Sequence, residues 1–347
     1  MVESKLYRSS LEGLYNSVEV DDKTFLITGA SGLIGSCLVD LLMSANTSGK
    51  HNRVYALGRS EERLLKRFSP FIASEGFHII EQDICVPLDD KYDFDYIIHC
   101  ASNADPRLYV KYPVETMVTN LKGGINVLEY VRKHKECKAE ILSTFEVYGD
   151  TVKDDYCESE TGLLNYYDIR SCYPESKRAI ETLALCYCKE YGVNVNIGRL
   201  CSIYGPTMLP DDSKAHAQFL KNAVKGKDVV LKSKGTTIRS YCYVLDAVSA
   251  ILSILFHGSS PDVYNISNEN SVATIAQMAD IVAELSGRAV ATDLAENALD
   301  GNKYNPRNSI LNNDKLKGLG WTGHYDLKTG VSECLSILRE IQTDNEE

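Results

Sequence analysis

The sequence lacks several features that would assign it directly to a class of protein. Its 11 cysteines include no Cys-x-x-Cys pair, and the nearest two, Cys186 and Cys188, are separated by one residue. The spacing of zinc sites is therefore absent, and no metal is expected. The longest apolar runs fall far short of the roughly 20 residues that span a bilayer, so no membrane segment is predicted. Basic residues are outnumbered, 37 against 48 acidic ones, which disfavours a nucleic-acid-binding face.

The cysteine count also bears on the compartment. It is odd, the chain of 347 residues is long, and no signal-peptide pattern is evident. Disulfide frameworks are typical of short secreted chains with even counts, so we expect reduced thiols in a cytoplasmic protein. With 44% hydrophobic and 24% charged residues, the composition is that of a globular protein with ample core.

Short apolar runs alternate with segments of helical periodicity over the first part of the chain. Near-continuous apolar strands separated by helices predict a parallel sheet covered on both faces, which is a Rossmann-type doubly wound α/β fold. The periodicity predicts strands at 23–28, 53–57, 78–82, 96–100, 140–143 and 193–200, and helices at 36–45, 61–71, 115–133 and 173–191.

The pattern becomes less regular after residue 206. Short strands are expected at 228–231, 239–244 and 263–266, and a helix at 274–285. We therefore divide the chain into three parts whose elements interleave: an N-terminal arm or short helix, a mainly NAD(P)-binding domain, and a smaller C-terminal lobe, made mainly by the last third, that binds the substrate. These parts cover residues 1–22, 23–205 and 206–347.

A glycine-rich turn joins the first predicted strand to the first predicted helix, with the spacing G-x-x-G-x-x-G. In such a turn the first glycine allows a tight bend, the second lets a pyrophosphate approach the backbone, and the third packs helix on strand. The N-terminus of the helix then faces the phosphates. The turn predicts a dinucleotide site whose contacts are Gly29, Ser31, Gly32, Leu33, Ile34 and Gly35.

The end of the second predicted strand departs from the usual dinucleotide pattern. An acidic residue commonly binds the ribose hydroxyls there, but this sequence reads Leu-Gly-Arg-Ser over 57–60. Arg59 either faces a 2′-phosphate, which would make the cofactor NADP, or is solvated while the backbone holds the ribose. Asp83 and Ile84, after the third strand, are expected beside the adenine, and the alternative for Asp83 is a turn or cap.

Tyr173 and Lys177 have the spacing Y-x-x-x-K at the start of a predicted helix, so their side chains share one face. A positive charge near a phenol lowers its pKa, which predicts a general base for a sugar hydroxyl. Thr144, at the end of the fifth strand, would share the hydrogen bond of that hydroxyl. Alone, the spacing is a frequent chance match; the glycine turn and the segment S-T-F-E-V-Y-G (143–149) favour its catalytic reading.

Five motifs occur in an order that resembles the extended short-chain dehydrogenase/reductases, which include sugar-nucleotide epimerases, 4,6-dehydratases and decarboxylases. They are the glycine turn, S-T-F-E-V-Y-G, Tyr173/Lys177, G-R-L-C-S-I-Y-G-P (198–206) and R-S-Y-C-Y-V-L-D (239–246), and the resemblance runs from 23 to 321. It implies a catalytic set of Thr144, Tyr173 and Lys177 and a homodimer packed through helices that include 173–191. It further implies cofactor contacts at Ala101, Ser102, Asn120 and Lys177.

The resemblance also implies roles in substrate binding. Arg239 and Arg307 would hold the diphosphate of the substrate, the alternative for each being a surface salt bridge. Family 4,6-dehydratases resemble T-D-E after the strand, with the aspartate as an acid, and Phe145 at that place cannot donate a proton. Decarboxylases resemble T-S-E, with a glutamate and a later arginine near the substrate carboxylate. Glu146 and Arg239 fit those positions.

The stretch R-S-C-Y (170–173) likewise resembles UDP-glucuronate decarboxylases. Phe145 and Ser202, which stands where the family usually has an asparagine, depart from the family pattern within the substrate pocket, so the sugar is expected to be unusual. The resemblance implies a nucleotide-sugar enzyme that works through a transient 4-keto intermediate with bound NAD, with UDP-glucuronate decarboxylation as the first hypothesis. The alternatives are a C4 epimerase, an NADPH-dependent 4-keto reductase and, remotely, a non-catalytic nucleotide sensor.

Overall fold

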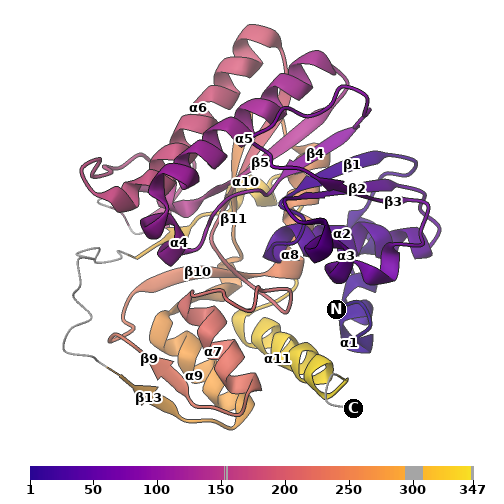
Figure 1. Ribbon diagram of the computed structural model, residues 1–347. Coiled ribbons are helices and arrows are strands. Elements are labelled where there is room, and N and C mark those ends of the chain that lie inside the picture. The colour runs from indigo at the N-terminus through magenta and orange to yellow at the C-terminus, as the bar shows by residue number, and fades with distance from the viewer. Residues whose placement is uncertain (152, 154, 294–307, 345–347) are drawn as a thin grey trace.

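A seven-stranded sheet forms the centre of the computed structural model, which describes residues 1–151, 153, 155–293 and 308–344 (Figure 1). Every neighbouring pair of strands in it is parallel. In spatial order the strands are β11 (Asp262–Ile266), β7 (Asn194–Leu200), β5 (Lys138–Thr144), β4 (Tyr96–His99), β1 (Thr24–Thr28), β2 (Arg53–Gly58) and β3 (Phe77–Glu81).

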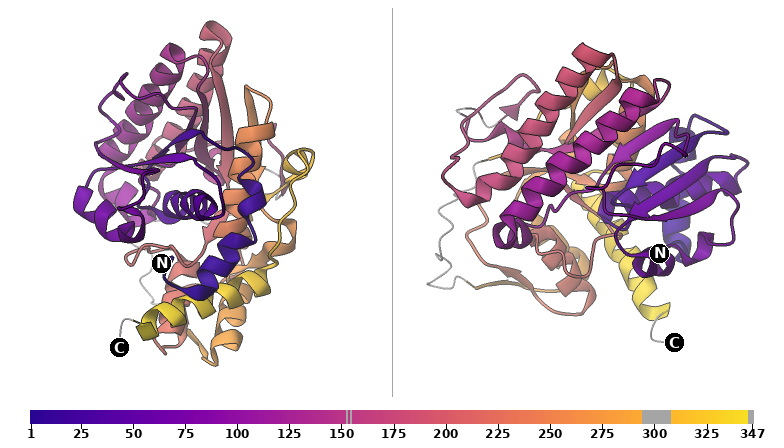
Figure 2. Two further views of the ribbon diagram at one scale, coloured as in Figure 1. Left: turned by 90° about the vertical axis from the view of Figure 1, so that its right-hand side faces the viewer. Right: turned by 45° about the horizontal axis from the view of Figure 1, so that its top comes forward.

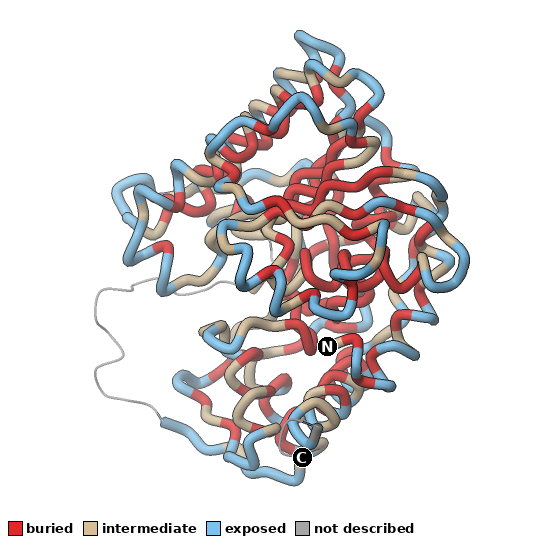
Figure 3. The backbone as a smooth tube through the Cα atoms, turned by 45° about the vertical axis from the view of Figure 1, so that its right-hand side comes forward, coloured by how far each residue is buried: buried red, intermediate tan, exposed pale blue. Residues whose placement is uncertain are grey.

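Helices cover both faces of this sheet, as Figure 2 shows. Residues of a strand point alternately to its two faces, and Phe25 and Ile27 accordingly join one hydrophobic cluster while Leu26 joins the other. Figure 3 shows buried segments through the interior of the molecule and exposed ones mainly at its periphery. The first cluster includes residues of α2 (Leu33–Thr47), α3 (Glu61–Arg67) and α8 (Val244–His257), and the second those of α5 (Pro113–Lys133) and α6 (Cys172–Tyr191).

The strand order reverses between β1 and β4. From β1 the chain first adds strands on one side, β2 and β3, and then crosses to add β4, β5, β7 and β11 on the other. Loops that leave neighbouring strands at such a switch point diverge and open a crevice at their carboxyl ends, where doubly wound folds bind ligands. The glycine turn follows β1 directly, so it lies at this crevice.

The smaller lobe is built on a three-stranded sheet, β12 (Val272–Thr274), β10 (Ile238–Tyr243) and β8 (Ser202–Tyr204). Two short parallel pairs complete the strands: β13 (Val290–Thr292) with β9 (Val229–Leu231), and β14 (Ile310–Leu311) with β6 (Asp155–Tyr156). The remaining helices outside the large sheet's two layers are α1 (Lys5–Glu12), α4 (Pro106–Lys111), α7 (Ala215–Val224), α9 (Ile275–Ser286), α10 (Asp314–Lys317) and α11 (Leu327–Asp344).

The two parts interleave along the chain. β8 precedes residue 206 yet belongs to the sheet of the lobe, whereas α8 and β11 follow it and return to the large sheet. The physical reason is pairing: β11 extends the parallel ladder at the free side of β7. A single boundary at residue 205 therefore separates the domain of the large sheet from the smaller lobe only approximately.

The N-terminal arm contains α1, which packs against α2 and α11. Tyr7 is fully buried, and its hydroxyl donates a hydrogen bond to the carboxylate of Asp40 in α2 over 3.0 Å. The guanidinium of Arg67, from α3, pairs with the same carboxylate. This buried charge pair ties the arm and α3 to the first helix of the Rossmann domain.

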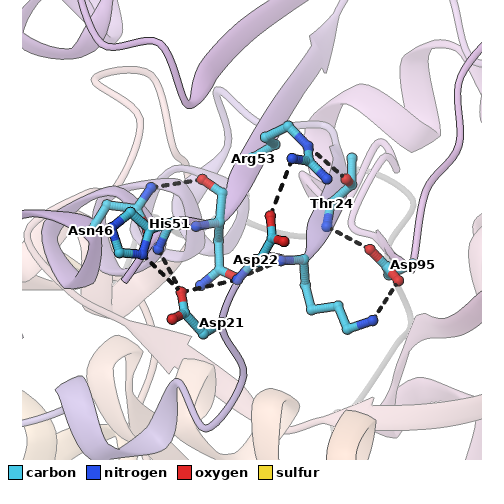
Figure 4. Close-up of polar contacts among 9 residues, drawn as sticks. Asp21, Asp22, Thr24, Asn46, His51, Arg53 and Asp95 are labelled. Carbon is cyan, nitrogen blue, oxygen red and sulfur yellow. Dashed lines mark hydrogen bonds and ion pairs between the residues drawn. The ribbon is translucent and has the colours of Figure 1, made fainter. Parts of the chain in front are cut away.

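A second polar network joins the amino ends of three strands, at the edge of the sheet opposite the glycine turn (Figure 4). Asp95 accepts from the backbone N–H of Thr24 over 2.8 Å, and Arg53 donates to the Thr24 hydroxyl over 3.1 Å. Asp22 pairs with Arg53 at 3.3 Å. These contacts hold the starts of β1, β2 and β4 together. No helix in the described part of the chain has the length and apolarity to span a membrane.

Candidate active site

The glycine turn packs so closely that side chains are excluded at two positions. Gly29 has φ +63°, and a Cβ there would lie 2.8 Å from the Cα of Ala101, just beyond β4. A Cβ on Gly35 would lie 2.5 Å from the carbonyl oxygen of Gly29. Gly32 is the N-cap of α2, so the free N–H groups of that helix begin at the turn. This arrangement fits the pyrophosphate of a dinucleotide.

A cavity of about 450 Å³ lies between the carboxyl ends of the central strands and the lobe. It brings together most of the residues predicted from the sequence, although they come from separate elements. Those that line it are Gly29, Gly32, Leu33, Ile34, Gly35, Ser102, Thr144, Phe145, Glu146, Tyr173, Lys177, Ser202 and Arg239.

Several predicted cofactor residues lie outside the lining of this cavity. Arg59 is exposed just after β2. The Asp83 carboxylate accepts from the backbone N–H of Cys85 over 2.8 Å, which is the turn role named as its alternative. Ile84 is buried, and its carbonyl accepts from Asn126 of α5. Their contacts with a cofactor stay predictions, as does that of Ser31; Arg307 lies outside the described residues.

Ala101 and Asn120 act on the site through their neighbours. The Ala101 N–H donates to the hydroxyl of Thr28 at the end of β1. The hydroxyl of Ser102 donates to Asn120 over 2.8 Å, and Asn120 in turn donates to Ser176 in α6 over 2.8 Å. This chain of hydrogen bonds ties the loop after β4 to α6, the helix that carries Tyr173.

Tyr173 and Lys177 occupy the first two turns of α6, as predicted, and both are buried. The Lys177 ammonium donates to the carbonyl oxygen of Leu142 over 2.8 Å. Burial lowers the pKa of Lys177 to about 8. A buried lysine whose pKa is lowered in this way stays protonated only where a carbonyl oxygen or an anion stabilises its charge.

The expected effect of Lys177 on the phenol is not what the structure shows. Burial, and secondarily the carboxylate of Glu146, raise the pKa of Tyr173, while the hydroxyls of Thr144 and Ser102 oppose that rise by hydrogen bonding. The prediction of a lowered phenol pKa was therefore wrong for this structure. The reason is that desolvation of a fully buried phenolate outweighs the lysine, whose ammonium is directed at Leu142.

Two residues beside Tyr173 and Glu146 had no role predicted from the sequence. Arg170 pairs with Glu146 at 2.9 Å, and both side chains are largely buried. The ring of Tyr109, from α4, stacks on the ring of Tyr173 with centroids 5.0 Å apart and planes 4° from parallel. The Arg170 guanidinium also lies over Tyr109, 5.5 Å from the ring centroid. Arg170 was quoted within R-S-C-Y without a role; Tyr109 has no local signal, since it is 64 residues before Tyr173.

On the lobe side, the Arg239 guanidinium lies over the ring of Phe145, 5.1 Å from its centroid, and donates to the Ser309 hydroxyl over 3.1 Å. Both Arg239 and Phe145 line the cavity. Phe145 thus has a structural role in orienting a cation at the site. Arg239 is placed to meet an anionic ligand, as the resemblance implied.

Comparisons with known proteins agree with this geometry. A model of the NAD dependent epimerase/dehydratase family matches residues 25–267. A UDP-glucuronic acid decarboxylase of Arabidopsis thaliana is 33% identical over 88% of this chain and 86% of its own, and one of Xenopus tropicalis is 30% identical over 94% and 76%.

Solved structures show the same fold. A UDP-glucose 4-epimerase of Thermotoga maritima superposes with a TM-score of 0.77 at 24% identity, covering 92% of this chain and 99% of that one. A dTDP-glucose 4,6-dehydratase of Bacillus anthracis in complex with NAD gives 0.75 at 23%, covering 93% and 98%. The predicted Rossmann-type fold, the enzyme class and the NAD cofactor are confirmed by these matches. The chain belongs to the NAD-dependent epimerase/dehydratase family.

Proposed function

We propose that this enzyme decarboxylates UDP-glucuronate through a transient 4-keto intermediate. The observation that carries the proposal is the Arg170–Glu146 pair, which stands beside Tyr173 in the cavity. The C6 carboxylate of a hexuronic acid is attached to C5, and C5 is bonded to C4, the carbon that is oxidised. A tyrosine that exchanges a proton with the C4 oxygen therefore needs a cation nearby that can bind the carboxylate. Arg170 has that position.

Different residues of this chain are proposed to transfer the proton, orient the sugar hydroxyl and hold the cofactor. Tyr173 takes the proton of the C4 hydroxyl, and Thr144 holds that hydroxyl in line. Bound NAD would accept the hydride from C4 and would give the same hydride back in the last step. The glycine turn, Ser102 and Lys177 would hold the cofactor, because the turn presents the N–H groups of α2 to the cavity and Lys177 carries the nearby charge.

The 4-keto sugar is a β-keto acid, so the bond to its carboxylate breaks with the electron pair moving toward the C4 oxygen. The phenol of Tyr173, protonated after the first step, donates a hydrogen bond to that oxygen as charge develops on it. Arg170 first binds the carboxylate. Glu146, held by the same arginine, is proposed to relay a proton from solvent water to C5 after carbon dioxide leaves.

The raised pKa of Tyr173 fits this cycle. A buried phenol with a raised pKa keeps its proton, so that it can donate a hydrogen bond to an enolate oxygen, and it needs a nearby cation before it can act as a base. Lys177, with its pKa lowered to about 8, lies one helical turn away on the same face and is the nearest such group on α6.

Arg239, from the lobe, is proposed to bind the diphosphate of the substrate. Arg307 would assist it. A homodimer packed through α5 and α6 is also proposed, and the partly exposed apolar side chains of Val114, Val118 and Leu185 on these helices support it. A cytoplasmic location is proposed on the composition of the chain.

Incubation with UDP-glucuronate and NAD tests the reaction directly. We expect carbon dioxide and a UDP-pentose in equal amounts, without net reduction of NAD. Tyr173→Phe should lower turnover by about 10²–10⁴-fold. Arg170→Met should lose turnover of UDP-glucuronate while it still binds UDP-glucose, which has no carboxylate. Arg132→Met, which removes a surface partner of Glu129, is the matched control.

C4 epimerisation is the second candidate, because it would use the same Thr144, Tyr173 and Lys177. A product of unchanged mass, with no carbon dioxide, would establish it and refute decarboxylation. Consumption of NADPH with a reduced product would instead indicate a 4-keto reductase. Full turnover by Tyr173→Phe would exclude the assigned chemistry altogether.

A further inference from the structure

His216 is a buried, titratable side chain of the cavity that the proposed chemistry does not use. It is the second residue of α7 and only 7% exposed, yet it lines the same cavity as Tyr173 and Arg239. Its ring stands edge-on to Tyr241 of β10, with centroids 5.9 Å apart and planes at 88°. A histidine in such a place contacts whatever ligand fills the lobe side of the cavity.

Charges of both signs surround His216. Arg239 and Tyr241 are two residues apart on β10, so they present their side chains to the same side of the lobe sheet. Lys214 is the N-cap of α7, and Lys214, Tyr241 and Arg239 all line the cavity. Asp211 and Asp212, just before the helix, also line it, and the Asp212 side chain pairs with Lys214 at 3.5 Å.

These surroundings keep the imidazole neutral. Burial first, then the charge of Lys214 and to a smaller extent that of Arg239, lower the pKa of His216 to about 4, although Asp212 and a hydrogen bond with the backbone of Ile203 oppose the shift. The same two cations attract anions. Two negative charges placed among them would cancel the repulsion that disfavours the imidazolium and add an attraction for it, because Coulomb effects between close, partly buried charges are large.

We propose that His216 is a substrate-binding residue that becomes protonated when the diphosphate of a nucleotide sugar binds beside Lys214 and Arg239, so that binding takes up a proton. This inference rests on the proposed function only in taking a nucleotide sugar as the ligand. It does not depend on what happens at the sugar. Affinity then rises as the pH falls, by at most tenfold for each pH unit over the range in which the bound form is protonated and the free form is not.

Calorimetry with UDP-glucose tests the proposal, since its diphosphate does not titrate near neutral pH and the sugar has no carboxylate. Titrations at about pH 6, with NAD present, in two buffers of different ionisation enthalpy give the number of protons taken up. The wild-type protein should take up a fraction of one proton, and the fraction should grow as the pH is lowered. His216→Gln should show no uptake and a Kd independent of pH. His257→Gln, an exposed histidine paired with Glu19, should match the wild type.

Equal proton uptake by wild type and His216→Gln would overturn the proposal, and so would the absence of uptake or of UDP-glucose binding in the wild type. If the variant does not fold, the imidazole signals of the wild type decide the question. One of its seven histidines should become protonated at a higher pH when UDP-glucose is added, and seven unchanged titrations would refute the idea. If binding of UDP-glucose takes up a proton but UDP-glucuronate releases no carbon dioxide, the proposed reaction is refuted and this inference still holds.

Discussion

Glu140 is a buried carboxyl whose replacement should change how the stability of the protein depends on pH. It lies in the middle of β5, fully buried, and neither of its oxygens has a hydrogen-bond partner among the described residues. Burial raises its pKa well above the usual range. Asn196 lies directly opposite in β7, and within the same part of the chain its side-chain oxygen has no partner either.

The sign of the effect follows from the raised pKa. The folded protein keeps a proton on Glu140 at pH values at which the unfolded chain has lost it. The stability from this group is therefore complete below the unfolded pKa and is lost as the pH rises toward the folded one, by about 1.4 kcal/mol per pH unit. Between pH 5.5 and 7.5 this slope sets an upper limit of about 3 kcal/mol on the loss.

Glu140→Gln has the same shape and no ionisable proton, so it should escape this loss. Unfolding in guanidinium, followed through the fluorescence of Trp321, measures the difference. That side chain is the protein's one tryptophan, and its indole N–H donates to Ser249 of α8 over 3.0 Å. We expect the unfolding free energy of the variant to exceed that of the wild type by a larger margin at pH 7.5 than at pH 5.5, with the two margins differing by up to about 3 kcal/mol.

Glu136→Gln, at an exposed position shortly before β5, serves as the control and should follow the wild type at each pH. Parallel pH dependences for wild type and Glu140→Gln would refute the reasoning, because they would mean that Glu140 ionises alike in the folded and unfolded chains. A variant that loses stability most at high pH would show instead that the Glu140 carboxylate is stabilised in the folded protein.

Three further changes test other parts of the structure. Gly35→Ala should weaken NAD binding at least about tenfold, since its Cβ would lie 2.5 Å from the Gly29 carbonyl oxygen in the turn; titration with NAD measures this. Asp40→Asn should cost about 3–5 kcal/mol in thermal or denaturant unfolding, because it leaves Arg67 buried without its counter-charge. Lys177→Met should abolish turnover. It should also raise the free energy of unfolding at pH 7 by about 3 kcal/mol. The pKa of Lys177 is lowered to about 8, so its protonated form is less favourable in the folded protein than in the unfolded chain.

The first two of these changes have a matched control. Gly13→Ala would bring its Cβ no closer than 3.4 Å to any neighbour and should be neutral. Asp89→Asn removes a solvent-exposed pair with Lys91 and should leave the unfolding transition nearly unchanged. Normal NAD affinity in Gly35→Ala, unchanged stability in Asp40→Asn, or a less stable Lys177→Met at pH 7 would each contradict the corresponding argument.

The features that the sequence alone determined are local ones. The glycine turn needs three glycines at fixed spacing next to a strand, and the Tyr173–Lys177 pair needs only one helical turn. Alternating apolar strands and helices likewise predicted the doubly wound sheet. Family resemblance then attached Thr144, Glu146 and Arg239 to the site, and the structure places all three around one cavity.

Tertiary structure decided what depends on contacts between distant segments. Tyr109 reaches Tyr173 only because α4 packs beside the start of α6, and His216 meets Tyr241 only because α7 folds onto the lobe sheet. The return of α8 and β11 to the large sheet likewise depends on a contact between distant segments, the pairing of β11 with β7.

The electrostatics of the site were equally beyond the sequence. The spacing of Tyr173 and Lys177 predicted a lowered phenol pKa, whereas burial raises it and Lys177 is held by the Leu142 carbonyl. A pKa is set by how completely a group is desolvated and by which charges stand nearest to it. Residue spacing along one helix specifies neither quantity, and both arise only when the strands, the loops and the lobe close around the site.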